Sequence, residues 1–538
     1  MSDDLFKIAL IIDEASPKGP INQLIRTLEA TNRDFSISVM ARARDNDRQN
    51  ETFVPNALFK TAPIVKTVKD RAALLALRLV FSLEQKLVAK RRQYKWLTQQ
   101  ADFRMLPLDN PLNDAQVFDA VIWLSQSDPN HAAPQIKGDR LQISFGASPD
   151  IFEAACRNDD CADFSISITE KHRALPQVAI AGSIMSANRW RLTHANMTLK
   201  AHAFIAKLIC ERADQGRWVY RNTQEFEAGQ SAPQTRAYIP HLRDIGAYAI
   251  KSFLGHPLKK FWEKSVRRRA PLWSISVLKD DGLTTDMSMA SRIPNPKSRF
   301  LADPYVISVK GETFCFAEDF FPDEKKGKIS VLKLAEQTAS SPEVVLDEPF
   351  HLSFPFVFQA GEDVFMIPET SAARQIRLYK AHSFPHDWRL HKVIMDNIDA
   401  ADTVAFEKEG RWYLLTNICS ADRSDHQSEL HLFSATDLMS DTWAPAERNP
   451  IIFDSKKARN AGFFERAGKF YRVNQVQARA QYGYAFEINE VTEISPDNYS
   501  EKCVKRVNPQ ISEGMMRTHH YHYNGDYTVF DHSYIERR

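Results

Sequence analysis

The chain has 538 residues, which is too long for one hydrophobic core and fits two or three domains. Apolar residues make up 43% and charged residues 26%, as in an ordinary globular protein, and a net charge of +2 gives no general attraction to nucleic acid. The six cysteines form no CxxC pair and no zinc-ligand spacing, which indicates free thiols in a reducing compartment.

The amino terminus reads MSDDLFKIALIIDEAS, with two aspartates before a short apolar run. This pattern predicts a buried first strand and not a signal peptide. Elsewhere in the sequence no apolar run approaches the ~18 residues that a membrane-spanning helix requires. We therefore expect a cytoplasmic protein.

Short apolar strands alternate with helical patterns through residues 1–245. The expected strands are KIALIID, FSISVMARA, FDAVIWLS, RLQISF, DFSISIT and QVAIAGSI, and the expected helices are INQLIRTLEATN and HANMTLKAHAFIAKLICERAD. Such alternation predicts an α/β domain with a mainly parallel sheet. No GxGxxG follows the first strand and no Walker motif occurs, so no nucleotide cofactor is expected.

This half resembles the amino-terminal domain of the formyltransferase family. The likeness lies in DAVIWLS, LQISFGASPDIFEA, FSISITEK and AIAGSIMSANRWRLTHANMTLKAHAFIAKLI, in the family's order. The resemblance implies a Rossmann-type fold and an Asn-x-His on the strand LQISFGASPD, where this chain has Ser144 and Gly146 instead. Without these groups formyl transfer has no catalytic chemistry, so a scaffold or substrate-binding role is expected, with formyl transfer as the alternative.

Two basic stretches interrupt these patterns, at residues 83–97 and 250–273. Their lysines and arginines alternate with aromatic and aliphatic residues. One interpretation is a surface for anionic lipid head groups or a lipid-linked substrate. The other is a solvated connecting helix. The second stretch marks a linker at 246–272 between a first domain, 1–245, and a second, 273–538.

A hairpin pattern repeats in the second domain at intervals of roughly fifty residues, which is typical of a β-propeller blade. The copies are 303–318, 354–369, 402–417 and 461–475, with a looser fifth at 518–532. We expect five four-stranded blades closed by strands from both ends of the domain. The equivalent hairpin turns should contain Gly311, Gly361, Gly410, Gly468 and Gly525.

The second domain resembles the propeller domain at the amino-terminal side of plant glucosamine inositolphosphorylceramide transferases. The likeness is carried by FLADPYV, AEDFF, FHLSFPFVF, MIPET, ADTVAF, GRWYLLTN, YRVNQ, QYGYAFEINEVTEISPDNYSE and HHYHYNGDYTVFDH. The architecture is more distantly similar to the five-bladed propellers of arabinanases, invertases and levansucrases. This second resemblance implies that an early aspartate and two further acids ring an axial pocket.

Residues at one position of the repeat become neighbours at one mouth of the central channel. Two columns follow from aligning the hairpins: Asp303, Phe354, Asp402 and Ala461 at the start, and Glu318, Glu369, Asn417 and Gln475 at the end. The expected catalytic acids are Asp303, Glu369 and Asp402, because glycosyl chemistry needs one carboxylic acid and one carboxylate. As the alternative, Asp303 and Asp402 begin their strands through Asx-type turns.

The same mouth is expected to hold residues that bind sugar hydroxyls or a phosphate. The candidates are Glu318, His351, Ser353, Asn417, Arg472, Gln475, His520 and Asp531. His519 and His520 with Asp531 suggest an acid/base or metal group, but adjacent strand residues point to opposite faces, so only one histidine can serve. We expect neither a resident metal nor a cofactor.

Two functions remain open from the sequence. One is a carbohydrate-active enzyme that transfers or hydrolyses a glycosyl unit in the biosynthesis of a surface polysaccharide. The other is a glycan-binding propeller without catalysis, joined to a degenerate formyltransferase-like scaffold. The acids at equivalent positions of the repeat favour the enzyme. Asn417 and Gln475, which stand where other repeats have acids, are compatible with a protein that only binds glycans.

Overall fold

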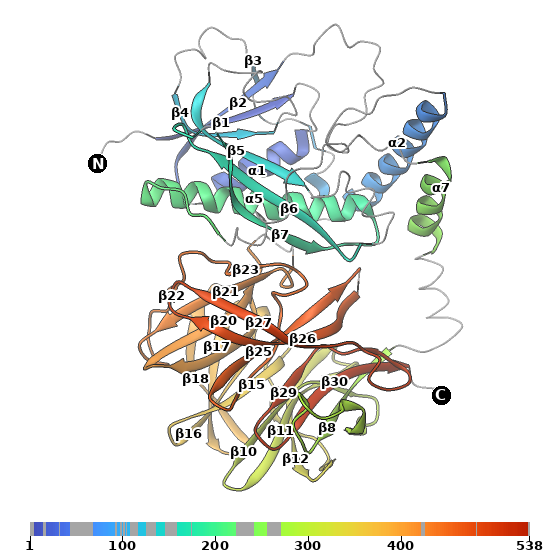
Figure 1. Cartoon of the computed structure of the whole chain (residues 1–538), viewed down its shortest axis with the longest axis vertical. Helices are drawn as coiled ribbons and strands as arrows, with labels where there is room; N and C mark the ends of the chain where they lie inside the picture. The colour runs from blue at the N-terminus through green and yellow to red at the C-terminus, as the bar shows by residue number, and fades with distance from the viewer. Residues whose placement is uncertain are drawn as a thin grey trace. The chain divides into compact units, whose positions relative to one another are not determined.

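The chain forms two compact units that divide after residue 258 (Figure 1). The computed structural model describes residues 5–13, 18–31, 33–42, 68–91, 94–96, 99–100, 103, 105–107, 117–124, 136–145, 159–173, 175–221, 241–255, 271–420, 425–479 and 481–535.

The first unit contains a seven-stranded sheet in the order β3-β2-β1-β4-β5-β6-β7. The pairs from β3 to β5 are parallel, and the pairs β5/β6 and β6/β7 are antiparallel. Four of these six pairs are parallel, so the sheet is mainly parallel as predicted, with the two antiparallel pairs at one end of it. The strands are β1 (Phe6–Asp13), β2 (Phe35–Arg42), β3 (Met105–Pro107), β4 (Val117–Trp123), β5 (Lys137–Phe145), β6 (Cys161–Thr169) and β7 (Gln177–Met185).

Helices accompany this sheet because apolar runs such as Ile8–Ile12 are fully buried and need cover. They are α1 (Lys18–Glu29), α2 (Val68–Ala89), α5 (Trp190–Gln215) and α7 (Leu242–Ile250), followed by a π turn at Lys251–Gly255. Helix α5 ends at Gly216, which adopts φ 68° and donates its N–H to the Arg212 carbonyl at 3.0 Å. None of the helices in the described ranges is long and apolar enough to cross a membrane.

The expected boundary at residue 245 is wrong, because α7 runs through it. This helix packs against α2 within the first unit, so residues 246–250 do not belong to a linker. Most of the basic stretch 250–273 lies outside the described residues, as do residues 92, 93 and 97 of the stretch 83–97 and Gly146 in the first unit.

The second unit is a five-bladed propeller, as the repeat predicts. Each blade is a separate antiparallel sheet. The innermost strands β10, β15, β19, β24 and β29 contact one another in this order, and β29 contacts β10, which closes the ring.

The blades contain the following strands in chain order. They are β10 (Phe300–Val309), β11 (Glu312–Phe321), β12 (Lys326–Ala335), β13 (Thr338–Ala339) and β14 (Glu343–Leu346); β15 (Ser353–Ala360), β16 (Asp363–Glu369), β17 (Gln375–Ser383) and β18 (Asp387–Asp396); β19 (Ala400–Lys408), β20 (Arg411–Ile418), β21 (Glu429–Ala435), β22 (Ala444–Pro445) and β23 (Ile452–Phe453); β24 (Asn460–Arg466), β25 (Lys469–Ala478), β26 (Gln481–Ile494) and β27 (Tyr499–Val507); and β28 (Met515–Arg517), β29 (Tyr521–Tyr523) and β30 (Thr528–Ile535) with β8 (Pro271–Leu278) and β9 (Ser291–Arg292).

Strands from both ends of the domain close the last blade. β8 pairs antiparallel with β30 over eight residue pairs, from Pro271↔Ile535 to Leu278↔Thr528. The five predicted glycines all lie in the inner hairpin turns with positive φ: Gly311 (81°), Gly361 (61°), Gly410 (74°), Gly468 (71°) and Gly525 (105°).

Each innermost strand of the first three blades begins with a β-bulge. Asp303, Phe354 and Asp402 adopt left-handed backbone there, with φ of 49°, 47° and 49°. A bulge inserts one residue into one strand, so it turns the side chains that follow. In the fourth blade Ala461 likewise follows the paired residue, Asn460, but the residue with positive φ is the next one, Gly462, at 138°.

The second column is shifted in the fourth blade. Glu318, Glu369 and Asn417 each pair with the residue before the bulge of their own blade. The residue paired in this way in the fourth blade is Asn474, opposite Asn460, and not Gln475.

Candidate functional site

Side chains from all five blades meet around the channel axis. Asp303 of the first blade accepts the Phe354 N–H of the second blade at 3.3 Å. Asp531 of the fifth blade accepts the N–H of Asp303 at 3.2 Å. Arg459, which precedes β24, bonds Asp402 and Glu369 of the third and second blades.

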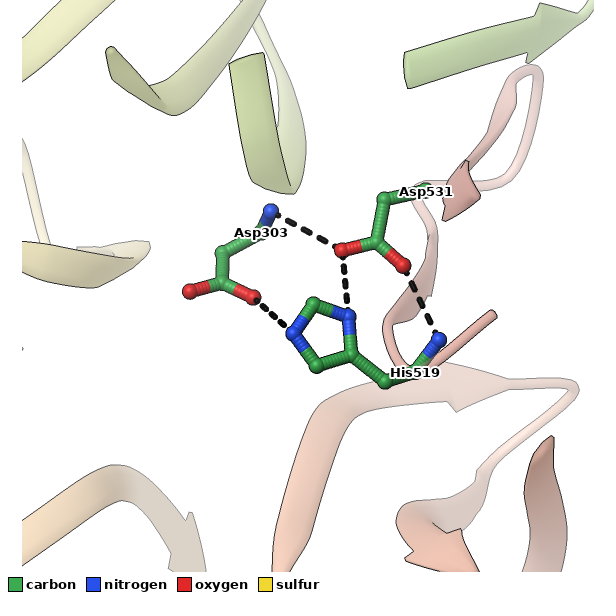
Figure 2. Close-up of side chains that lie close together, drawn as sticks. All are labelled: Asp303, His519 and Asp531. Atoms are coloured by element: carbon green, nitrogen blue, oxygen red, sulfur yellow. Dashed lines mark hydrogen bonds and ion pairs between the residues drawn. The ribbon is translucent and has the colours of Figure 1, made fainter. Parts of the chain in front are cut away.

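His519 lies between two aspartates (Figure 2). Its Nδ1 is 2.6 Å from Asp531 Oδ2, and its Nε2 is 3.6 Å from Asp303 Oδ1. Asp531 is fully buried and also accepts the main-chain N–H groups of His519 and His520, both at 3.0 Å. The imidazole stacks on Trp273 with ring centroids 4.1 Å apart. Asp531 therefore orients His519, and Nε2 faces Asp303.

Arg459 joins the other two predicted acids. Its Nε donates to Asp402 and its Nη2 donates to Glu369 Oε2 at 3.3 Å. Glu369 also accepts the Ser371 hydroxyl at 2.8 Å. The Asp402 side chain is only 3% exposed, whereas Glu369 keeps 15%. Glu369 can thus meet a ligand at the mouth, and Asp402 holds Arg459 beneath it.

A third contact at the mouth joins Glu318 and His351. His351 Nδ1 accepts the Gly327 N–H at 2.8 Å, so the neutral ring carries its proton on Nε2. That nitrogen lies 3.4 Å from Glu318 Oε1. A Cβ at Gly327 would sit 2.8 Å from the His351 ring and 2.9 Å from Glu318, so only glycine leaves room for this pair. Ser353, buried, pairs with Glu369 across β15 and β16.

The buried carboxyl groups have divergent proton affinities. Burial raises the pKa of Asp303 to about 6, although the His519 charge acts to lower it. Burial also raises the pKa values of Glu318 and Asp402 well above their usual range, and neighbouring carboxylates add to this. Burial acts to raise the pKa of Glu369 too, but the Arg459 charge and hydrogen bonds from Asp402 and Ser371 bring it below its usual value.

The pKa of Asp531 is lowered, because the His519 charge and hydrogen bonds outweigh burial. Conversely, burial acts to lower the pKa of His519, but Asp531 and Asp303 raise it. The site therefore contains the ion pair of His519 with Asp531 and the Arg459 guanidinium, which bonds both Glu369 and Asp402. Asp303, Glu318 and Asp402, whose pKa values are raised, retain their protons to higher pH than carboxyl groups in water do.

Two of the predicted binding residues do not reach the mouth. Arg472 is fully buried, and its guanidinium bonds Glu501 at 2.6 and 2.7 Å together with the Lys457 and Ala458 carbonyls. Asn417 is also fully buried and donates to the Glu429 and Ala458 carbonyls at 2.8 and 2.9 Å. Both side chains stabilise the propeller, because their polar groups are occupied by the chain itself.

Gln475 and His520 also lie beneath the site. Gln475 donates to the Tyr482 hydroxyl at 3.0 Å and is 1% exposed. His520 packs edge-on against Tyr305 and Phe354, with centroids 4.6 and 5.3 Å away, and burial lowers its pKa well below the usual value. Of the histidine pair, His519 faces the acids, whereas the His520 ring packs among Tyr305 and Phe354.

Three residues at the site were missed from the sequence. Arg459 and Tyr482 come from the fourth blade, and Trp273 from β8 supports His519. Arg459 stands just before the bulge residues of its blade, in ARNAGFF, and alignment on the start of each inner strand could have found it. Tyr482 and Trp273 carry no repeat signal.

Asp303, His519 and Asp531 each offer one ligand atom, and these atoms lie within 4.8 Å of one another, so they could hold a metal ion. The 2.6 Å separation of His519 Nδ1 and Asp531 Oδ2 is that of a hydrogen bond and is too short for two ligands of one ion. A cation would therefore contact His519 Nε2 and Asp303, with Asp531 orienting the ring from behind.

The fold and the site together define the class of protein, which is a five-bladed propeller with a cluster of carboxyl groups at its axis. Residues 280–526 match the family described as glucosamine inositolphosphorylceramide transferase 1, N-terminal. The chain is 30% identical over 234 residues to glucosamine inositolphosphorylceramide transferase 1 of Oryza sativa subsp. japonica, covering 41% of this chain and 31% of the relative. Its identity to the protein of that name in Arabidopsis thaliana is 32% over 210 residues, covering 38% and 27%. Less than a third of each relative is matched.

Solved structures of low sequence identity also resemble part of the chain. The catalytic domain of the GH62 α-L-arabinofuranosidase of Coprinopsis cinerea has a TM-score of 0.34 and 10% identity, covering 45% of this chain and 94% of that one. A thermostable family-43 glycoside hydrolase has a TM-score of 0.35 and 15% identity, covering 45% and 91%. At these TM-scores neither structure informs the chemistry of the site.

Proposed function

We propose that the axial mouth of the propeller acts on a glycan or glycolipid and transfers or hydrolyses a glycosyl unit. The observation that carries this proposal is the different surroundings of two carboxyl groups at the mouth, since Asp303 faces His519 at 3.6 Å and Glu369 pairs with Arg459 at 3.3 Å. Asp303 has a pKa raised to about 6, and Glu369 has one below its usual value. Pairs of this kind divide the roles of acid and base in glycosyl chemistry.

The roles follow from the contacts of each residue. Asp303, protonated below pH about 6, donates a proton to the leaving oxygen. Glu369, ionised beside Arg459, activates the acceptor hydroxyl or water, or attacks the anomeric carbon. Asp402 positions Arg459 and Glu369. Glu318, through its partly exposed carboxyl group, and His351, which is 39% exposed, bind sugar hydroxyls.

The named relatives support a glycolipid as the substrate, because they are glucosamine inositolphosphorylceramide transferases. The alternative is a glycan-binding propeller without catalysis. The observation that favours it is Arg459, which pairs with two of the three acids and reduces the number of carboxylates available for chemistry. Under both proposals the first unit is a formyltransferase-like scaffold that transfers no formyl group.

The test compares Asp303→Asn and Glu369→Gln with the exposed control Glu362→Gln on the same hairpin as Glu369. Turnover of aryl glycosides, and of nucleotide sugars with a glycolipid acceptor, should fall about 10²- to 10⁴-fold in the first two variants and stay unchanged in the control. The thermal midpoints should stay close to that of the parent protein.

A wild-type protein that binds these sugars without turning them over, and loses affinity in both variants, would support the binding function. Full turnover in both variants would contradict the assignment of the acids.

A further inference from the structure

Helix α2 exposes a line of leucines that no neighbouring element covers in the described structure. Leu75, Leu79 and Leu83 follow one another at intervals of four residues and are 58%, 63% and 45% exposed. The opposite face of the helix is buried through Leu77, Phe81 and other apolar residues. Exposing a second apolar face of a helix to water is unfavourable, so the outer leucines indicate a surface that binds a partner.

Helix α7 and the π turn that follows it also expose apolar side chains. Leu242, Ile250 and Leu254 are 47%, 63% and 55% exposed. Helix α7 lies against α2 (Figure 1). The Tyr248 hydroxyl donates to the buried Glu84 carboxylate of α2 at 2.7 Å, which fixes the two helices together. The exposed apolar side chains of these two joined helices and of the π turn are together called the α2/α7 face.

The charge around the α2/α7 face is positive. Lys86, Lys90, Arg91, Arg243 and Lys251 are exposed at its ends. The acidic side chains described on these helices do not balance them, because Glu84 is buried and Asp244 pairs with Arg243 at 3.4 Å. Apolar side chains bordered by lysine and arginine are the pattern of helices that lie at an anionic lipid interface.

We propose that the α2/α7 face docks onto the surface of an anionic lipid bilayer, with its leucines and Ile250 among the upper acyl chains and its basic side chains at the phosphates. A second copy of the chain fits this face less well, because a symmetric contact would bring the same basic side chains together. The proposal does not depend on the chemistry of the propeller.

The test is co-sedimentation of the full chain with vesicles of phosphatidylcholine alone or with about 30% phosphatidylserine, which supplies the anionic surface. We expect binding to the anionic vesicles only, and release by salt. Leu79→Glu should weaken binding by about tenfold or more, because the bilayer then no longer buries the side chain of this leucine. Lys86→Glu and Lys90→Glu should each weaken it at least about fivefold.

The matched control is Leu175→Glu, which changes a leucine of the same unit that is 77% exposed and lies outside the α2/α7 face. It should bind as the parent protein does. Circular dichroism should show unchanged folding for every variant, since the substituted side chains are exposed.

Three outcomes would overturn the proposal. The first is equal binding to neutral and anionic vesicles. The second is unchanged binding in Leu79→Glu. The third is a dimer of the parent chain, seen by light scattering, that Leu79→Glu converts to a monomer while neither form binds vesicles. This last result would assign the α2/α7 face to self-association.

Discussion

Asp303 shows at the scale of one residue how opposing influences set a proton affinity. Burial favours its neutral form, and the His519 cation favours its charged form. The result is a pKa of about 6, between the two extremes. Asp531 acts in two ways: its charge raises the pKa of Asp303 directly, and it orients His519 and raises the pKa of that imidazole. His519 and Asp531 are thus positioning residues for Asp303.

We predict a turnover that falls as the pH rises through about 6, where Asp303 loses its proton. Glu369, whose pKa is below the usual value, is already ionised on the acid side of this limb. His519→Gln removes the cation that lowers the pKa of Asp303, so the falling limb should move to higher pH. The measurement is kcat/KM against pH, with His386→Gln, a surface histidine that is 60% exposed, as the control. A limb that stays in place in His519→Gln would contradict this role.

Arg472 leads to a prediction about stability. Arg472→Met removes the guanidinium from the Glu501 carboxylate and from the Lys457 and Ala458 carbonyls, and loss of one partner of a buried ion pair costs about 3–5 kcal/mol. Arg389→Met removes an exposed pair with Asp387 and should cost less than about 1 kcal/mol. Urea unfolding compares the two variants. Equal losses would show that Arg472 does not stabilise the blade as its contacts indicate.

At the scale of elements, the first residues of strand β26 determine where His519 lies. Gly483 has φ 61°, and a Cβ there would lie 2.7 Å from His519 Cβ and 2.9–3.0 Å from its ring. The close approach of two blades at this point requires glycine. The His519 imidazole is held from the other side by Trp273.

Gly483→Ala should displace His519 and alter the pH profile of turnover. Gly468→Ala is the matched control, since this residue has φ 71° with no atom within 4 Å of an added Cβ. Both variants pay a similar backbone strain of about 1–2 kcal/mol and should lose similar thermal stability from it. Only Gly483→Ala should also change the pH profile. An identical profile in both variants would mean that the imidazole tolerates the methyl group.

At the scale of the whole molecule, the propeller depends on a strand from its own beginning. β8 covers the edge of β30 and lies between it and β9. Without β8, the last blade would present an unpaired edge and the ring would lose part of its fifth sheet. The closure links residues more than 250 positions apart in the sequence, such as Leu272 and Tyr534.

We predict that a fragment spanning residues 259–538 folds and that one spanning 281–538, which lacks β8, does not. Thermal unfolding followed by circular dichroism should be cooperative for the longer fragment only, because the shorter one cannot complete its fifth sheet. The shorter fragment should also aggregate through the open edge of β30. Cooperative unfolding of both at one temperature would show that β8 is dispensable.

The sequence by itself determined the propeller, its five blades and the glycines of the inner hairpins, because turn chemistry and strand alternation act between residues close in the chain. It also brought out Asp303, Glu369 and Asp402 from their place in the repeat. Only the tertiary structure decided which neighbours these acids meet. In the fourth blade the residue at the end of the repeat hairpin is Asn474, which pairs with Asn460, and not Gln475. Closure of the ring places His519, and not His520, next to Asp303. Burial and the Arg459 charge then set the pKa of Glu369. Both influences arise only when strands far apart in the sequence have packed together.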